Sequence, residues 1–110
     1  DFLAERYEFW AEELRAQFAS RYEALLAQTA EDLRKGGDPD GALELYLRVL
    51  ERDPYREEVH TQVMVCYHSL GNRRALRDQF QHLEGLLRAE LNVEPLPETR
   101  ELYESLMLSL

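Results

Sequence analysis

The stretch "GGDPDGALELYLRVLERDP", residues 36–54, carries the signals that define one helix and its limits. Two glycines can close a preceding helix, and Pro39 cannot continue it, because proline lacks the amide donor of a helix interior. Apolar residues then recur at intervals of three and four, as one face of a helix requires: Ala42, Leu45, Tyr46, Val49 and Leu50. The "RDP" at 52–54 ends this pattern, so the stretch predicts one amphipathic helix.

The same period continues on both sides of this helix. Upstream, it predicts one long helix through Trp10, Leu14, Phe18, Tyr22, Leu25, Leu26, Thr29 and Leu33. Downstream, it predicts a third helix from about Arg56 to the Gly71-Asn72 turn, and a fourth that reaches Leu91. No segment alternates apolar and polar residues convincingly, as a strand would. Short Gly, Asn and Pro turns between helices favour an all-α fold built from antiparallel hairpins.

A repeat of 34 residues runs through these helices. It relates Gly37 to Gly71, Leu33 to Tyr67, Ala42 to Leu76, Tyr46 to Phe80, and Val49 to Leu83. Positions of the first copy match the alternation of large, small and aromatic residues in a tetratricopeptide repeat: Leu26, Ala30, Leu33, Ala42, Tyr46, Val49 and Pro54. We predict one domain over residues 1–110, with two degenerate repeats at 23–56 and 57–90. Two repeats cannot bury all their faces, so a long N-terminal helix and a C-terminal helix should cap them.

The segment "LNVEPLPETRELYESL", residues 91–106, predicts a sharp corner before the last helix. Asn92 suits the left-handed position after a helix, and Pro95 blocks continuation. Pro97 suits the first turn of a new helix, where no amide donor is needed. Leu96 stands where a side-chain cap is usual, so we expect this cap to be missing, with Leu96 packed instead as a hydrophobic staple.

Composition excludes several classes of protein. The net charge is −9, with 13 basic and 22 acidic residues, which is the wrong balance for holding DNA phosphates. No apolar run approaches the roughly 20 residues of a membrane span. The only cysteine, Cys66, lies in the apolar run "VMVCY" and is expected to be a buried thiol in a reducing cytoplasm. The sequence does not begin with methionine, so we expect a fragment of a longer polypeptide.

No constellation in the sequence indicates catalysis, a cofactor or a metal. Adjacent carboxylates such as Glu12 and Glu13 point about 100° apart on a helix and suit a solvated face. The histidines His60, His68 and His82 lack the spacing of a metal pair on one helix, although a composite site between helices stays open. "KGGDPDG" follows a helix rather than a strand, unlike a phosphate-binding loop. Five aromatic residues are expected in the core rather than on a base-stacking platform: Trp10, Tyr22, Tyr46, Tyr67 and Phe80.

Repeat geometry predicts a partner surface, because the first helix of each tetratricopeptide hairpin lines a concave groove. The positions in that register are Ala27, Glu31, Arg34, Lys35, Glu58, Thr61, Val65, His68 and Ser69. Their small and polar side chains would leave a shallow groove for a peptide or helix. The alternatives are that two repeats are too short to curve, or that the long first helix fills the groove.

The C-terminal segment 91–106 closely resembles the signature of the bacterial transcriptional activator domain, typically L-G-V-E-P-S-P-E-T-R-x-L-Y-x-x-L. "DFLAERYEFWAEELR" (1–15) and "DPYREEVHTQVMVCYHSLGNRRAL" (53–76) resemble its N-terminal segment and central hairpin. Asn92 and Leu96 depart from the signature. The resemblance implies a tetratricopeptide-like module of Streptomyces-antibiotic-regulatory-type activators and related regulators, which usually follows a winged-helix DNA-binding domain.

The resemblance therefore implies a non-enzymatic, cytoplasmic bacterial module that contributes to transcription activation through protein contacts. Its expected partners are RNA polymerase or adjacent regulator domains, with a homodimer possible through exposed repeat ends and the aromatic N-terminal helix. The fragment itself is expected to bind neither nucleic acid nor membrane. The competing hypothesis is a generic tetratricopeptide-type peptide-binding adaptor unrelated to transcription. A hydrolase or ligand sensor would need a concave polar pocket that the sequence does not indicate.

Overall fold

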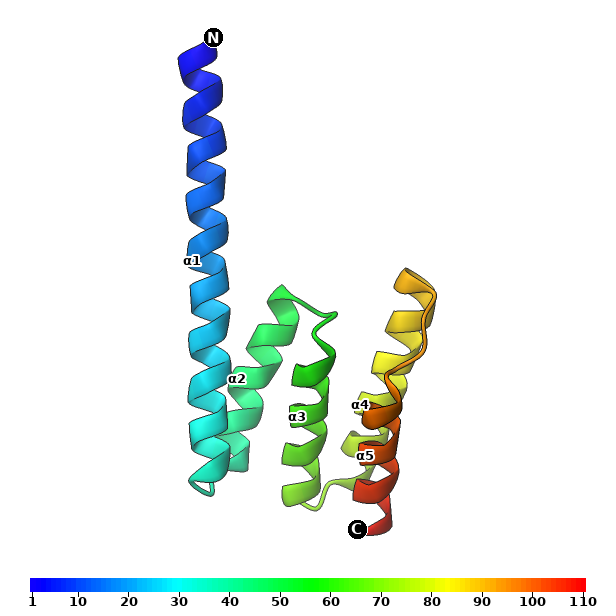
Figure 1. Cartoon of the computed structure of the whole chain (residues 1–110). Coiled ribbons are helices and arrows are strands. Elements are labelled where there is room, and N and C mark those ends of the chain that lie inside the picture. Colours follow the sequence, from blue (N-terminus) through cyan, green and yellow to red (C-terminus); the bar gives the residue numbers. More distant parts are fainter.

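The computed structural model describes all residues 1–110 and contains only helices, which confirms the all-α prediction (Figure 1). The elements are α1 (Phe2–Lys35), α2 (Pro39–Arg52), α3 (Glu57–Ser69), α4 (Arg73–Leu86), the π-helical turn η1 (Leu87–Leu91) and α5 (Pro97–Leu108). No helix combines the length and apolarity needed to cross a bilayer.

Polar caps and glycines set the helix limits that the sequence predicts. The Asp38 carboxylate accepts a hydrogen bond from the Gly41 amide at 2.9 Å, and Asn72 accepts one from the Ala75 amide at 3.1 Å. Gly37 and Gly71 precede these caps with φ of 90° and 70°, which glycine adopts without strain. Asn92 has φ 54° and ψ 41°, so its predicted left-handed conformation is confirmed.

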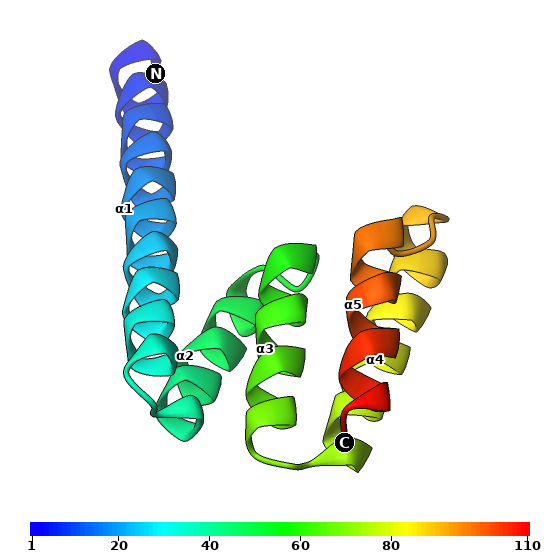
Figure 2. The same ribbon diagram turned by 60° about the horizontal axis from the view of Figure 1, so that its bottom comes forward.

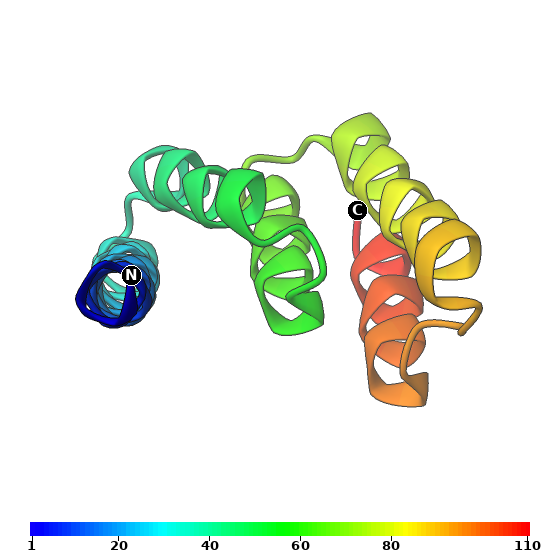
Figure 3. The same ribbon diagram turned by 90° about the horizontal axis from the view of Figure 1, so that it is seen from above.

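The helices lie in two rows. Figure 3 shows α1, α3 and α5 along one side, with α2 and α4 behind them, and Figure 2 shows consecutive helices running antiparallel. The main core lies among α1, α2 and α3, and its buried residues are Leu26, Ala30, Ala42, Tyr46, Val49, Leu50, Val59, Val63 and Cys66. A second cluster joins α3, α4 and α5 around Met64, Leu76 and Phe80.

Residues related by the 34-residue register are buried to the same degree. Ala42 and Leu76 are both fully buried, while Tyr46 and Phe80 are 3% and 4% exposed. The stacked pair formed by Phe80 and Tyr103, with ring centroids 4.1 Å apart, extends the second cluster onto α5. Equivalent positions therefore anchor α2 and α4 to the neighbouring row.

The N-terminal half of α1 does not pack against any other helix, and Tyr22, further along α1, lies at the edge of α2 with the Arg52 guanidinium 5.0 Å from its ring centroid. The prediction that Trp10 and Tyr22 belong to the core is therefore wrong. Trp10 is 59% exposed and Tyr22 is 45% exposed. The radius of gyration is 17.1 Å, against roughly 13 Å for a compact domain of this length. Helical periodicity identifies an apolar face, but it carries no information on whether another element of the chain covers that face.

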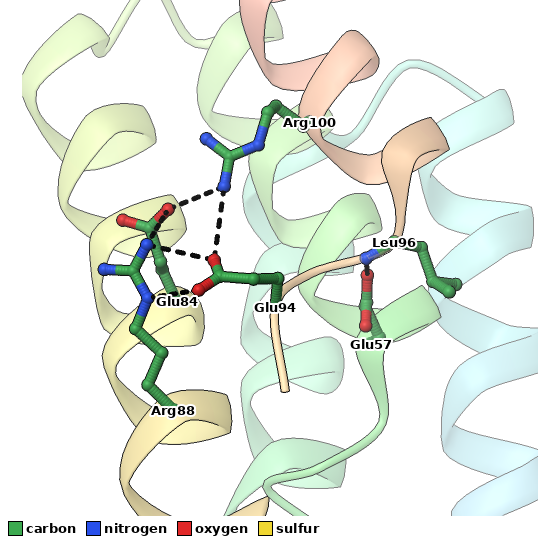
Figure 4. A network of polar contacts seen from close by, with 6 residues as sticks. All are labelled: Glu57, Glu84, Arg88, Glu94, Leu96 and Arg100. Atoms are coloured by element: carbon green, nitrogen blue, oxygen red, sulfur yellow. Dashed lines mark hydrogen bonds and ion pairs between the residues drawn. The ribbon is translucent and has the colours of Figure 1, made fainter. Parts of the chain in front are cut away.

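The last helix is capped from outside its own segment (Figure 4). Leu96 has no side-chain acceptor, as predicted, but Glu57 of α3 supplies one. Its Oε2 accepts hydrogen bonds from the Leu96 amide at 2.8 Å and from the Thr99 hydroxyl at 2.6 Å. Leu96 is 57% exposed, so the staple prediction is wrong, and Pro95 is buried in its place. The cap thus depends on a contact between residues 39 positions apart.

A second set of ion pairs holds the corner between α4 and α5 (Figure 4). Arg88 donates two hydrogen bonds to Glu94, at 2.8 and 2.9 Å, and Arg100 donates one to Glu84 at 2.8 Å. The hydrogen bonds from Arg88 lower the pKa of Glu94. Arg100 also lies over the Phe80 ring, 5.3 Å from its centroid. These contacts fix the direction in which α5 returns to the hairpins.

Candidate functional site

A hollow of about 370 Å³ opens between α1 and α3 and is the candidate partner-binding site. Its lining comes from α1, α2, the turn before α3, and α3: Ala24, Ala27, Gln28, Glu31, Tyr46, Arg56, Glu58, Val59 and Gln62. Tyr46 of α2 is almost fully buried and forms part of the floor. The small side chains Ala24 and Ala27 keep the α1 wall low, so the hollow is shallow and open along α1 and α3.

The polar rim of the hollow carries two carboxylates, Glu31 and Glu58, together with one guanidinium, Arg56, and the amides of Gln28 and Gln62. Glu31 pairs with Lys35 one turn later on α1 at 3.0 Å, and Arg56 Nε donates to Glu58 Oε1 at 2.9 Å. Both contacts are solvent-accessible, and such pairs contribute about 0 to 1 kcal/mol, so a ligand can displace them at little cost. The arrangement suits a polar peptide or helix that carries basic side chains.

The side chains of Arg34 and Cys66 lie next to Tyr46 at the floor of the hollow. Burial raises the pKa of Tyr46, and the Arg34 guanidinium beside its hydroxyl opposes this shift. The Nε of Arg34 is buried without a hydrogen-bond partner. Burial also raises the pKa of the Cys66 thiol, which is fully enclosed, so its predicted role as a small core residue is confirmed. Of these three residues only Cys66 is fully enclosed, since Tyr46 faces the hollow and Arg34 is half-buried.

The structure brings together three of the nine predicted partner-surface residues. Ala27, Glu31 and Glu58 line the hollow. Thr61 instead lines a separate hollow between α3 and α5, and its hydroxyl donates to the Glu58 carbonyl at 2.6 Å. His68 forms a 2.7 Å hydrogen bond with Ser109.

The remaining four predicted residues do not line this hollow: Arg34, Lys35, Val65 and Ser69. Arg34 and Val65 are half-buried, while Lys35 and Ser69 are exposed at the C-terminal ends of α1 and α3. The predicted set therefore extends further along the helices than the hollow does.

Several lining residues were missed by the sequence interpretation although the 34-residue register contains them. Gln28 and Gln62 are 34 residues apart and face the hollow from α1 and α3. The same interval separates Ala24 from Glu58. Gln28 and Gln62 each directly follow a residue of the predicted set, Ala27 and Thr61, so widening the register by one position would have found them. Glu58 was already predicted, and one turn toward the start of α1 leads from Ala27 to Ala24. The sequence does not indicate that Tyr46 contacts the hollow, because the repeat assigns Tyr46 to the core.

The histidines do not form a composite metal site. The rings of His60 and His82 come within 6.2 Å, but both nitrogens of His60 are already engaged. Nε2 donates to the Pro54 carbonyl at 2.8 Å, and Nδ1 lies 2.8 Å from the Gln79 amide nitrogen, from which it accepts. His60 is therefore a neutral core residue that ties the turn before α3 to α4, and burial lowers its pKa.

Comparison with known proteins places the chain among transcriptional regulators. It is 32% identical over 74 residues to the transcriptional regulatory protein MoaR1 of Mycobacterium bovis, and equally to MoaR1 of Mycobacterium tuberculosis. The match covers 67% of this chain but only 24% of each relative, so the chain corresponds to about a quarter of their length. No solved structure matches the chain.

The family comparison covers nearly the whole chain. The model of the bacterial transcriptional activator domain matches residues 1–107, from the start of α1 to the last turn of α5. This family consists of non-enzymatic domains of transcriptional regulators, and the resemblance found in the sequence is confirmed. The chain belongs to the bacterial transcriptional activator domain family.

Proposed function

We propose that this chain is the protein-interaction module of a bacterial transcriptional activator and acts in the cytoplasm together with a DNA-binding domain outside these residues. Membership of the family supports the regulatory role, and the hollow between α1 and α3 is the observation that supports a protein contact. The net charge of −9 makes direct DNA binding by these residues unfavourable.

The binding surface is proposed to follow from two tetratricopeptide-like repeats, at 23–56 and 57–90. In this arrangement α1 and α3 are equivalent first helices and face the same hollow, with Gln28 and Gln62 at matching positions. Its partner would be a segment of RNA polymerase or of an adjacent regulator domain; a second copy of the chain is a further candidate. The acidic rim at Glu31 and Glu58 favours a basic segment.

Binding of the chain to RNA polymerase and to promoter DNA tests this proposal, at about 0.15 M salt. We expect binding to polymerase and none to DNA. The variant Glu31→Arg/Glu58→Arg should weaken the polymerase contact at least tenfold while the helical circular dichroism stays constant. Glu44→Arg is the matched control, since Glu44 is an exposed α2 residue outside the hollow and is also paired with an arginine.

Each outcome of this experiment decides between functions. Binding to DNA with a steep salt dependence would overturn the protein-contact role. Absence of polymerase binding would favour the adaptor hypothesis, in which the family fold serves a partner unrelated to transcription. If the Glu44→Arg control loses as much affinity for polymerase, the binding site is not the hollow, and the loss is a general effect of charge.

A further inference from the structure

Glu58 forms part of two hollows, one on each side of α3. The first is the hollow between α1 and α3, and the second, of about 320 Å³, lies between α3 and α5 and is called here the α3–α5 hollow. Glu58 lies on the outer ridge of α3, between Gln62 on the side of the first hollow and Thr61 on the side of the second. Since α1, α3 and α5 lie in one row (Figure 3), a ligand that crosses this ridge at Glu58 contacts both hollows.

The α3–α5 hollow offers a ligand mainly apolar contacts. Leu96 and Leu102 line it from the start and the first half of α5. The hydroxyls of Thr61 and Thr99 in its lining are both engaged within the chain, as donors of 2.6 Å hydrogen bonds to the first turn of α3. Because these polar groups are already satisfied, an apolar side chain that enters the hollow breaks no hydrogen bond of the protein. The hollow therefore suits an apolar anchor.

The charges around the two hollows are complementary to a basic ligand. Their linings contain four carboxylates and only one base, Arg56. Glu57 is committed to capping α5, which leaves Glu31, Glu58 and Glu98 for a ligand. Glu31 and Glu58 line the first hollow from α1 and α3, so a guanidinium between them can pair with carboxylates of both walls.

The distance between the two hollows favours a helical ligand. The hollows lie on either side of α3, so they are about one helix spacing apart, roughly 10 Å. An extended segment covers this distance in about three residues, but side chains three positions apart on a strand point to opposite faces. In an α-helix about seven residues span the same distance, and side chains seven positions apart share a face. A helix can therefore place one side chain in each hollow.

We propose that a basic helix of a partner protein binds across α3, with an arginine between Glu31 and Glu58 and an apolar side chain seven positions away in the α3–α5 hollow. This inference rests on the proposed protein-contact role and names the chemistry of the partner segment. The arginine supplies charge complementarity, and the apolar side chain supplies burial. The partner is therefore recognised by the spacing of two side chains as well as by its charge.

Nuclear magnetic resonance titration of the isotope-labelled 110-residue chain with designed peptides tests the proposal, at about 0.15 M salt. The probe is an alanine- and glutamine-based helix of about 20 residues, with a central arginine and a leucine seven positions to either side. Either direction of binding then offers a leucine to the α3–α5 hollow. We expect the amide signals of Gln28 and Leu102 to shift together, with one dissociation constant. Absence of shifts at millimolar concentrations of the probe would overturn the proposal.

Two control peptides separate the spacing of the side chains from the composition. Replacing both leucines by serine should weaken binding about tenfold, because burial of one leucine side chain contributes about that factor. The remaining shifts should then lie at Gln28 and not at Leu102. Moving both leucines to five positions from the arginine turns them about 140° away from it and should weaken binding equally. Equal affinity of the three peptides, or shifts confined to one hollow with the original probe, would overturn the proposal.

Substitutions in the chain test the apolar anchor independently. Leu96→Ser should weaken binding of the leucine probe about fivefold and leave binding of its serine version unchanged. The cap of α5 stays intact in this variant, because Leu96 contributes its amide and not its side chain to the contact with Glu57 (Figure 4). Leu108→Ser is the matched control, since Leu108 is exposed on the same helix but lines neither hollow. Equal effects of the two variants would refute the anchor in the α3–α5 hollow.

These results are separable from the test of the proposed function. If polymerase binds through Glu31 and Glu58 while the leucines of the probe contribute nothing, the protein-contact role stands and the helix across both hollows is refuted. If the probe engages both hollows but polymerase does not bind the chain, the helix-binding surface stands and its partner is a protein other than polymerase.

Discussion

Replacing Glu57 by alanine should destabilise the whole domain by detaching the start of α5 from α3. The Glu57 carboxylate accepts from the Leu96 amide at 2.8 Å and from the Thr99 hydroxyl at 2.6 Å. Leu96 offers no acceptor of its own, so the substitution removes the only side-chain cap of this helix. Thr99 is 4% exposed, so its hydroxyl would lose the hydrogen bond to Glu57 at a position where solvent has little access to replace it.

The expected magnitude follows from these two losses. Removal of an N-cap side chain costs about 1 kcal/mol, and a buried hydroxyl left without a partner costs about 1 to 3 kcal/mol. Because partial relaxation lets some water in, we expect the free energy of unfolding to fall by about 2 kcal/mol. This corresponds to a decrease in Tm of about 8 °C for a domain of this size. Glu57→Gln keeps one acceptor oxygen, so it should lower the free energy of unfolding by about half as much as Glu57→Ala.

Urea unfolding followed by circular dichroism at pH 7 measures this loss, with Glu58→Ala as the control. Glu58 is the next residue of α3 and carries the same charge in the same first turn, but it pairs only with Arg56 at the surface. Its substitution should cost less than about 0.5 kcal/mol. Equal losses for the two variants would refute the cap across α3 and α5. A double-mutant cycle with Thr99→Val should show a coupling of about 1 kcal/mol.

Three further predictions concern the core, α4 and pH. Phe80→Ala should lower the free energy of unfolding by about 3 to 5 kcal/mol, because Phe80 is buried and stacked on α5, whereas Phe9→Ala should change it by less than about 0.5 kcal/mol in the same urea assay. Gly85→Ala should raise the melting temperature, with a gain of about 0.5 to 1 kcal/mol, since the added Cβ meets no atom within 4 Å and stiffens the α4 interior. Burial lowers the pKa of His60 below 6.5, so the unfolded chain takes up a proton first as the pH falls, and stability should decline below about pH 6.5. His60→Gln should flatten this decline in unfolding titrations, while a matching effect of exposed His82→Gln would refute its assignment to His60.

The hollow between α1 and α3 could be predicted only in part. The 34-residue register identified Ala27, Glu31 and Glu58, because helical period and repeat interval together fix which face of α1 meets which face of α3. It also included His68, whose side chain is held by Ser109 from the far end of the chain. Such contacts depend on how α5 folds back, which local sequence patterns do not specify.

The sequence alone determined the number of helices, most of their limits and the apolar face of each. Glycines at 37 and 71, Asn92 and Pro97 act locally, through backbone conformations and missing donors that need no distant partner. The tertiary structure decided what local signals leave open. Glu57 caps a helix 39 residues away, and Trp10, on an apolar face as regular as any in the core, remains uncovered. Periodicity describes one surface of a helix, whereas burial and capping require two surfaces to meet.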